Sequence, residues 1–161
     1  MQEHFLEATA WAGFWSQWGE TLARVPGMKE EMLRRVGNRM QEELQGAIGS
    51  SGLHDSRGRV AAWQNPHLGS GGGYVAIRAD SVEVAAGGNH RQRLNAGALT
   101  NFLTSGHRVR GPSGRTERYQ PRGTMARVPG YHFYQATAER VEAIAAQEAK
   151  ALIRELEEQL K

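Results

Sequence analysis

Apolar residues recur at helical spacing near the C-terminus and in the first third of this chain, and this pattern constrains the fold more than any other feature. Residues 134–160 carry charges on one helical face and an apolar set on the other, namely Val141, Ala145, Ala149, Leu152, Leu156 and Leu160. A second apolar period runs over residues 28–48 and stops at Gly49, a residue typical of helix C-termini. The spacing predicts two long amphipathic helices, each of which needs a partner for its apolar face.

The first segment, residues 1–25, is rich in aromatic side chains. Trp11, Phe14, Trp15 and Trp18 follow the spacing i, i+3, i+4 and i+7, so one helix would gather them on a single stripe. A membrane-surface helix would need a lysine-rich polar face, which this segment lacks. We therefore interpret the four residues as a packing stripe, and we expect the tryptophans to be buried against the core or a neighbouring subunit. The following Pro26 and Gly27 predict a break before the next helix.

The middle of the chain has a β character. Residues 58–64, 73–79 and 81–86 are predicted strands, separated by turn-forming residues, and they indicate an antiparallel sheet of three or more strands. The glycine run at 69–73 lacks the lysine of a phosphate loop and opens no helix, so it is interpreted as a hairpin tip. Next, Asn95 as N-cap and Gly106 as stop predict a short helix.

These elements predict one α+β domain over residues 1–161, with helices packed on one face of a small antiparallel sheet. Residues 107–127 contain almost no apolar side chains and several prolines and glycines, which favours a long basic loop. A long amphipathic C-terminal helix, residues 134–161, follows it. The chain has no cysteine, so its stability cannot depend on disulfides.

Charge is distributed unevenly along the chain. The formal net charge is +3, yet residues 85–130 hold eight arginines and one acid, Glu117. Arginine favours bidentate pairing with carboxylate or phosphate. We expect the loop arginines to form an inter-subunit or ring-to-ring protein interface; they are Arg108, Arg110, Arg115, Arg118, Arg122 and Arg127. Direct nucleic-acid binding is one alternative, although the segment offers few aromatic side chains for stacking on bases. A solvated loop with no fixed partner is the other.

Catalytic and metal-binding patterns are missing from the sequence. The histidines show no paired spacing near carboxylates, and without cysteines no thiolate ligand exists. His54, Asp55 and Ser56 are adjacent and cannot form a catalytic triad, which needs contacts between separated segments. We therefore expect no enzyme activity, no metal and no cofactor. The sequence also lacks an apolar run of membrane-spanning length and a basic, secretory-type N-terminus, so neither membrane insertion nor export is expected.

Two motifs on either side of the arginine-rich loop resemble a known family. The segment NFLTSGHRVR contains Gly106, and VPGYHFYQATAERVE contains Pro129 and Gly130. In this order and spacing they resemble the head-tail joining or tail-completion (neck) proteins of long-tailed bacteriophages. In that family a Gly-His-Arg turn closes a short helix, a variable loop follows, and a Val-Pro-Gly-aromatic turn leads into the last helix. The resemblance covers residues 26–161, and the paired strands around DSRGRVAAWQ and GSGGGYVAIR are similar as well.

The resemblance implies a structural virion protein of the phage neck, assembled in the host cytoplasm. It implies a ring of copies of this chain, six in number, between the portal or head-closure ring and the tail tube. Genomic DNA would pass through the lumen. The alternative function is a nucleic-acid-binding phage accessory protein that acts through the arginine-rich loop.

Overall fold

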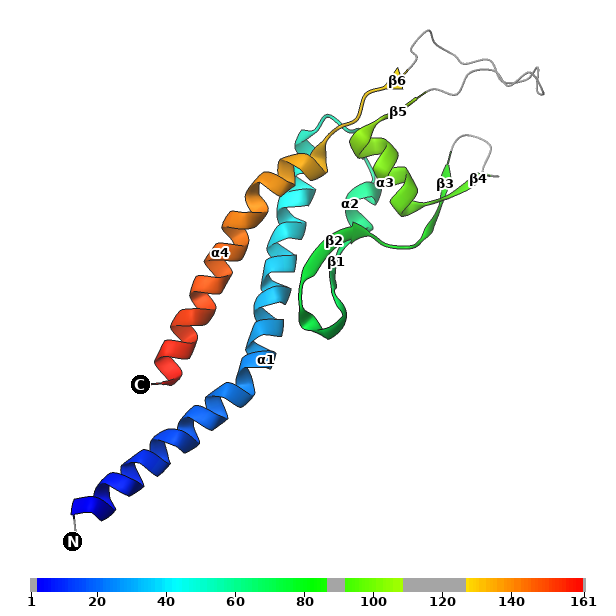
Figure 1. The fold of residues 1–161 in the computed structure, drawn as a ribbon. Coiled ribbons are helices and arrows are strands. Elements are labelled where there is room, and N and C mark those ends of the chain that lie inside the picture. Colours follow the sequence, from blue (N-terminus) through cyan, green and yellow to red (C-terminus); the bar gives the residue numbers. More distant parts are fainter. Residues whose placement is uncertain (1–2, 87–91, 109–126, 161) are drawn as a thin grey trace, which may run out of the picture.

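A long helical hairpin forms the body of the molecule in the computed structural model (Figure 1). The structure describes residues 3–86, 92–108 and 127–160, and side chains within 15–84, 94–108 and 127–160. Helices α1 (Glu3–Ser50) and α4 (Phe133–Gln159) run antiparallel side by side, and the other elements lie near the end where α1 finishes and α4 begins, with the hairpin at residues 64–79 extending back along α1. The predicted α+β class is confirmed, as is the C-terminal helix.

The expected break at Pro26 is wrong, because α1 continues through this residue. A proline inside a helix removes one backbone hydrogen bond and crowds the preceding turn, which bends a helix more often than it ends one when tertiary contacts support both sides. Here α4 lies alongside, and the side chain of Gln17 donates to the backbone oxygen of Gln159 at 3.1 Å. Figure 1 shows α1 bending where its colour changes from dark to light blue.

The β-strands form hairpins, and the expected single sheet of three or more strands is wrong for the described residues. Three separate antiparallel pairs are present: β1 (Gln64–Leu68) with β2 (Val75–Ala79), β3 (Glu83–Ala86) with β4 (Gln92–Asn95), and β5 (His107–Arg108) with β6 (Arg127–Val128). Each strand has at most five residues, and no strand of one pair forms a ladder with a strand of another among the described residues. The glycine run forms the turn between β1 and β2, as predicted, and includes the short 3-10 helix η1 (Ser70–Gly72).

The first predicted strand, residues 58–64, is wrong over most of its length, because Arg59–Ala62 form helix α2. The carboxylate of Asp55 accepts hydrogen bonds from the backbone N–H groups of Arg59 (2.8 Å), Val60 (2.8 Å) and Ala61 (3.2 Å). An acidic side chain that satisfies the free N–H groups of a first turn stabilises a helix at that point. The strand prediction failed because this cap, and not the β-favouring composition, decides the local conformation.

Helix α3 (Ala96–Ser105) matches the predicted short helix. The side chain of Asn95 accepts a hydrogen bond from the backbone N–H of Gly97 at 2.8 Å, which confirms the N-cap. Gly106 ends the helix with φ 73°, a conformation that favours glycine.

The apolar core lies where the end of α1, α2 and the start of α4 meet. Leu44, Ile48, Val60 and Phe133 are all buried there. Burial of such a side chain stabilises the fold by about 1.5–3 kcal/mol. The β1–β2 hairpin packs on α1 at Gly37, where an added Cβ would come within 2.9 Å of both Pro66 and Val75.

A polar network ties this core to α3 and β1. Gln64 is fully buried, its amide nitrogen donates to the Thr100 hydroxyl at 3.0 Å, and its amide oxygen accepts from the Tyr134 hydroxyl at 2.5 Å. The indole of Trp63 also donates to Thr100, at 3.0 Å. Burial raises the pKa of Tyr134, and a hydrogen bond with the backbone of Ala79 partly offsets the rise.

Candidate functional site

The two halves of the motif around the arginine-rich loop meet in space. The chain that returns towards α4 donates two backbone hydrogen bonds to the end of α3, from Tyr131 to Leu103 (2.8 Å) and from His132 to Thr104 (2.9 Å). These bonds satisfy carbonyl groups that the end of a helix leaves without an intrahelical partner. The predicted structural turns at Gly106, Pro129 and Gly130 therefore form one junction between α3 and α4.

Gly106 and Gly130 are in mutual backbone contact at this junction. A Cβ added to Gly106 would come within 2.7 Å of the nitrogen of Gly130, and a Cβ added to Gly130 would come within 2.6 Å of the nitrogen of Gly106. Backbone atoms cannot rotate away as a flexible side chain can. Both positions therefore require glycine for the two segments to approach this closely.

Strands β5 and β6 lie directly beyond the junction and hold the ends of segment 109–126 together. Their register pairs His107 with Val128 and Arg108 with Arg127. Both arginines are exposed, and Arg127 donates to the backbone oxygen of Ser105 at 3.3 Å. Like charges that face each other across a ladder repel, so this pair suits an anionic partner. Four more of the predicted interface arginines lie outside the described residues: Arg110, Arg115, Arg118 and Arg122.

Apolar groups border the arginine pair. Phe102 is 46% exposed, while Val128 and Tyr131 are each 38% exposed. The ring of Phe102 lies 5.4 Å from that of His107, measured between ring centres. Exposed aromatic side chains next to arginine are typical of the central residues of protein interfaces. The junction thus combines a closely packed backbone, two facing cations and apolar surface.

Ion pairs hold α1 and α4 together along the helical hairpin. The carboxylate of Glu148, which is 13% exposed, accepts from Arg35 at 3.0 Å and from Arg39 at 2.9 Å. The hydrogen bonds from Arg39 and Arg35 lower the pKa of Glu148 below its ordinary value. Nearer the core, Arg140 pairs with Glu43 at 2.7 Å.

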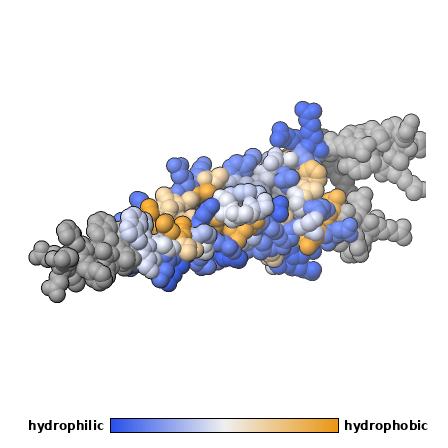
Figure 2. All heavy atoms as spheres, turned by 60° about the horizontal axis from the view of Figure 1, so that its bottom comes forward, coloured by the Kyte–Doolittle hydropathy of each residue, from blue (hydrophilic) through white to orange (hydrophobic). Residues whose placement is uncertain are grey.

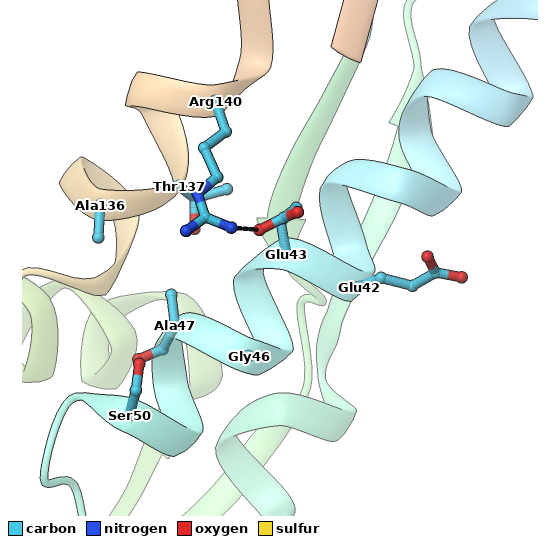
Figure 3. A pocket seen from close by; sticks show the side chains of 8 residues that line it. All are labelled: Glu42, Glu43, Gly46, Ala47, Ser50, Ala136, Thr137 and Arg140. Carbon is cyan, nitrogen blue, oxygen red and sulfur yellow. Dashed lines mark hydrogen bonds and ion pairs between the residues drawn. The ribbon is translucent and has the colours of Figure 1, made fainter. Parts of the chain in front are cut away.

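A cleft of about 390 Å³ opens between α1 and α4 around this last ion pair (Figure 3). Its lining residues are Glu42, Glu43, Gly46, Ala47, Ser50, Ala136, Thr137 and Arg140. The hydroxyl groups donate to helix carbonyls, Ser50 to Ala47 at 3.3 Å and Thr137 to Phe133 at 2.9 Å. With its hydroxyls bonded to backbone and Glu43 in an ion pair, the cleft presents no activated nucleophile.

The predicted aromatic stripe lies on the part of α1 far from the core. Trp15 is 65% exposed and Trp18 is half-buried, so Trp15 does not belong to the core of a single chain. The side chains of Trp11 and Phe14 lie outside the described residues. Burial of the stripe against a neighbouring subunit stays a prediction.

Within the described part of the chain, no group of three or more metal-ligating side chains is close enough to hold an ion. Over the same residues, no helix is both long and apolar enough to cross a membrane. Comparisons with protein-family models, curated proteins and solved structures give no match. The functional argument therefore depends on the geometry of this molecule.

Two features of the site were not predicted from the sequence. The small-residue lining of the cleft has a weak signal, since Gly46 and Ser50 are four residues apart in α1 and so share a face. The buried network of Gln64, Thr100 and Tyr134 has none, because its members belong to three elements that are far apart in the sequence.

Proposed function

We propose that this protein is a structural, non-enzymatic subunit of the neck of a long-tailed bacteriophage. In this role it forms a homo-oligomeric ring that joins the head, through the portal or head-closure ring, to the tail tube. Genomic DNA passes through the ring. The observation that carries the proposal is the junction at Gly106 and Gly130, where the two motif halves that resemble the neck family lie side by side.

The geometry of the junction supports an assembly role for the arginine-rich segment. Both ends of the segment are fixed at one exposed site, with Arg108 opposite Arg127 and with Phe102 and Tyr131 at the border. Within the part of the chain that the structure describes, no carboxylate is paired with Arg108 or Arg127. A neighbouring subunit or ring that offers carboxylates would form charge-assisted hydrogen bonds of about 1.5–3 kcal/mol each before ordering costs.

The test uses purified protein together with heads and tails of the phage that encodes it. Negative-stain electron microscopy of the wild-type protein should show rings, and adding the protein to separated heads and tails should yield joined particles. The double variant Arg108→Ser, Arg127→Ser should fold, as judged by circular dichroism, and should join fewer particles. The matched control Arg57→Ser, Arg78→Ser removes two arginines elsewhere and should join normally. Normal joining by the first variant, or no rings from the wild type, would count against the proposal.

Nucleic-acid binding is the second candidate, and the same arginine pair favours it, because two exposed cations on one short ladder can also face phosphate groups. This function requires DNA affinity from the isolated protein that falls steeply with salt. Fluorescence anisotropy with labelled duplex DNA over a range of salt concentrations separates the two candidates. Loss of DNA binding in the Arg108→Ser, Arg127→Ser variant, with particle joining unchanged, would favour the accessory-protein function.

A further inference from the structure

The arginine pair at the junction is an exposed cationic surface with apolar side chains around it. Arg108 and Arg127 face each other across the β5–β6 ladder. Val128, next to Arg127, is 38% exposed, and Phe102, whose ring lies against that of His107, is 46% exposed. Like charges opposite each other destabilise a strand pair, and carboxylates that bind them remove the repulsion. This surface therefore favours a partner that combines carboxylates with an exposed apolar side chain.

The last two turns of α4, residues 153–159, have the matching composition. They carry one cation against three exposed glutamates, a net charge of −2, and the glutamates are Glu155, Glu157 and Glu158. Ile153 is 54% exposed and lies four residues before Glu157, on the same side of the helix. Figure 2, which turns the bottom of Figure 1 towards the viewer, shows apolar residues among hydrophilic ones at this end of the helical hairpin. We name residues 153–159 the acidic end of α4.

The glutamates of the acidic end have no ion-pair partner in the part of the chain that the structure describes. The last turn of α4 also contains no basic residue. The C-terminus of a helix carries partial negative charge, so acidic side chains there are unfavourable and nearby cations are favourable. A cationic partner would remove this repulsion, and the acidic end therefore gains from a contact that one chain does not make.

The two surfaces lie at opposite ends of the molecule. The arginine pair is next to the start of α4, since the backbone of His132 bonds to that of Thr104 at the junction. Helix α4 has 27 residues, and with a rise of about 1.5 Å per residue its two ends are roughly 40 Å apart. Figure 1 shows the C-terminal end of α4 far from β5 and β6. Because no side chain spans this distance, the two surfaces can meet only between two copies of the chain.

We infer that the arginine pair of one copy binds the acidic end of α4 of a second copy. The contact joins unlike ends, and each copy offers one surface of each kind, so it can repeat from copy to copy and close into a ring. The inference rests on the proposed function in that it assigns the contact between subunits of the ring. DNA or a different protein on the arginine pair is an outcome that the experiment separates.

Charge reversal on each side, followed by mixing, tests the inference with the full-length protein. The junction variant is Arg108→Glu, Arg127→Glu, and the helix-end variant is Glu157→Arg, Glu158→Arg. In sedimentation equilibrium at low salt the wild type should associate reversibly, and each variant alone should associate roughly tenfold more weakly or less. An equimolar mixture of the two variants should recover association to within about threefold of the wild type, because the reversed surfaces are complementary again.

A matched control reverses two other exposed glutamates of α4, nearer its start: Glu139→Arg, Glu142→Arg should associate as the wild type does. Circular dichroism should show equal helix content in all proteins. The helix-end variant places cations where a helix C-terminus favours them, so it tests the inference even if the junction variant is destabilised. A wild type that stays monomeric, a helix-end variant that associates normally, or a mixture that stays dissociated overturns the inference. A junction variant that loses binding to duplex DNA but keeps self-association also overturns it, and assigns the arginine pair to nucleic acid.

The proposed function fails separately, since it is judged by the joining of heads to tails. Restored association in the mixture, with no joining of heads and tails by the wild type, would support this inference and count against the neck function. Joining that depends on the arginine pair, with no recovery of association in the mixture, would do the reverse.

Discussion

Gly106 and Gly130 pack backbone against backbone where the segment that leaves α3 runs antiparallel to the segment that enters α4. Gly106 also has φ 73°, which L side chains rarely adopt, and its neighbours include the backbone oxygen of Val128. The contact fixes both ends of the arginine-rich segment at one place, and it also directs the chain into the final helix. A fold defect at this point would therefore affect the segment and α4 together.

Adding a methyl group at this contact should be strongly destabilising. We expect Gly130→Ala to lower the free energy of unfolding by about 2 kcal/mol or more, since the overlapping atoms are backbone and cannot move aside. The matched control is Gly46→Ala in the interior of α1, where an added Cβ meets nothing within 4 Å. That change should stabilise the protein by about 0.5–1 kcal/mol through helix propensity. Urea denaturation followed by circular dichroism measures both, and a neutral Gly130→Ala would contradict the account.

The cap on α2 gives a second prediction. Asp55→Ala removes the acceptor for three backbone N–H groups, so it should lower the free energy of unfolding by about 1–2 kcal/mol. Asp55→Asn keeps one side-chain oxygen and should cost less. Thermal denaturation of the two variants tests the order, and an equal loss in both would show that the carboxylate geometry is unimportant.

Tyr134 should make stability sensitive to alkaline pH. Its pKa is raised by burial, so the folded state keeps the phenol proton where the unfolded state releases it. This contribution is complete below the ordinary tyrosine pKa of about 10, and it is lost as the pH rises towards the folded-state value. Tyr134→Phe should therefore show a shallower loss of stability above about pH 10. At neutral pH it should cost about 1–3 kcal/mol, because the buried amide oxygen of Gln64 loses its donor. Urea titrations at several pH values measure both effects.

Glu148 should make the stability of the fold sensitive to acid pH. Its pKa is lowered by Arg39 and Arg35, so its contribution is present above the ordinary glutamate pKa of about 4.3. The contribution is lost as the pH falls through the lower folded-state value. Glu148→Gln should cost about 1 kcal/mol at neutral pH, since both arginines are partly exposed, and should differ least from the wild type in strong acid. Glu142→Gln, an exposed change on the same helix, is the control and should have little effect.

The amphipathic segments show how much of the fold can be predicted from local sequence. The C-terminal helix and α3 follow from apolar spacing, an asparagine cap and a glycine stop, all of which act within a few residues. The predicted break at Pro26 and strand at residues 58–64 failed for a common reason. In each case a contact with another residue outweighs local propensity, namely the support of α4 at one site and the Asp55 cap at the other.

The sequence by itself determined the candidate groups: the aromatic stripe, the arginine-rich segment and the glycines on either side of it. Only the tertiary structure decided which of these groups meet. Gly106 and Gly130 are separated by the whole arginine-rich segment, and Gln64, Thr100 and Tyr134 belong to β1, α3 and α4. Contacts between such distant residues depend on how the elements pack, because neither helical nor strand periodicity encodes the position of one element against another. Periodicity specifies only which face of an element needs a partner, and packing selects the partner.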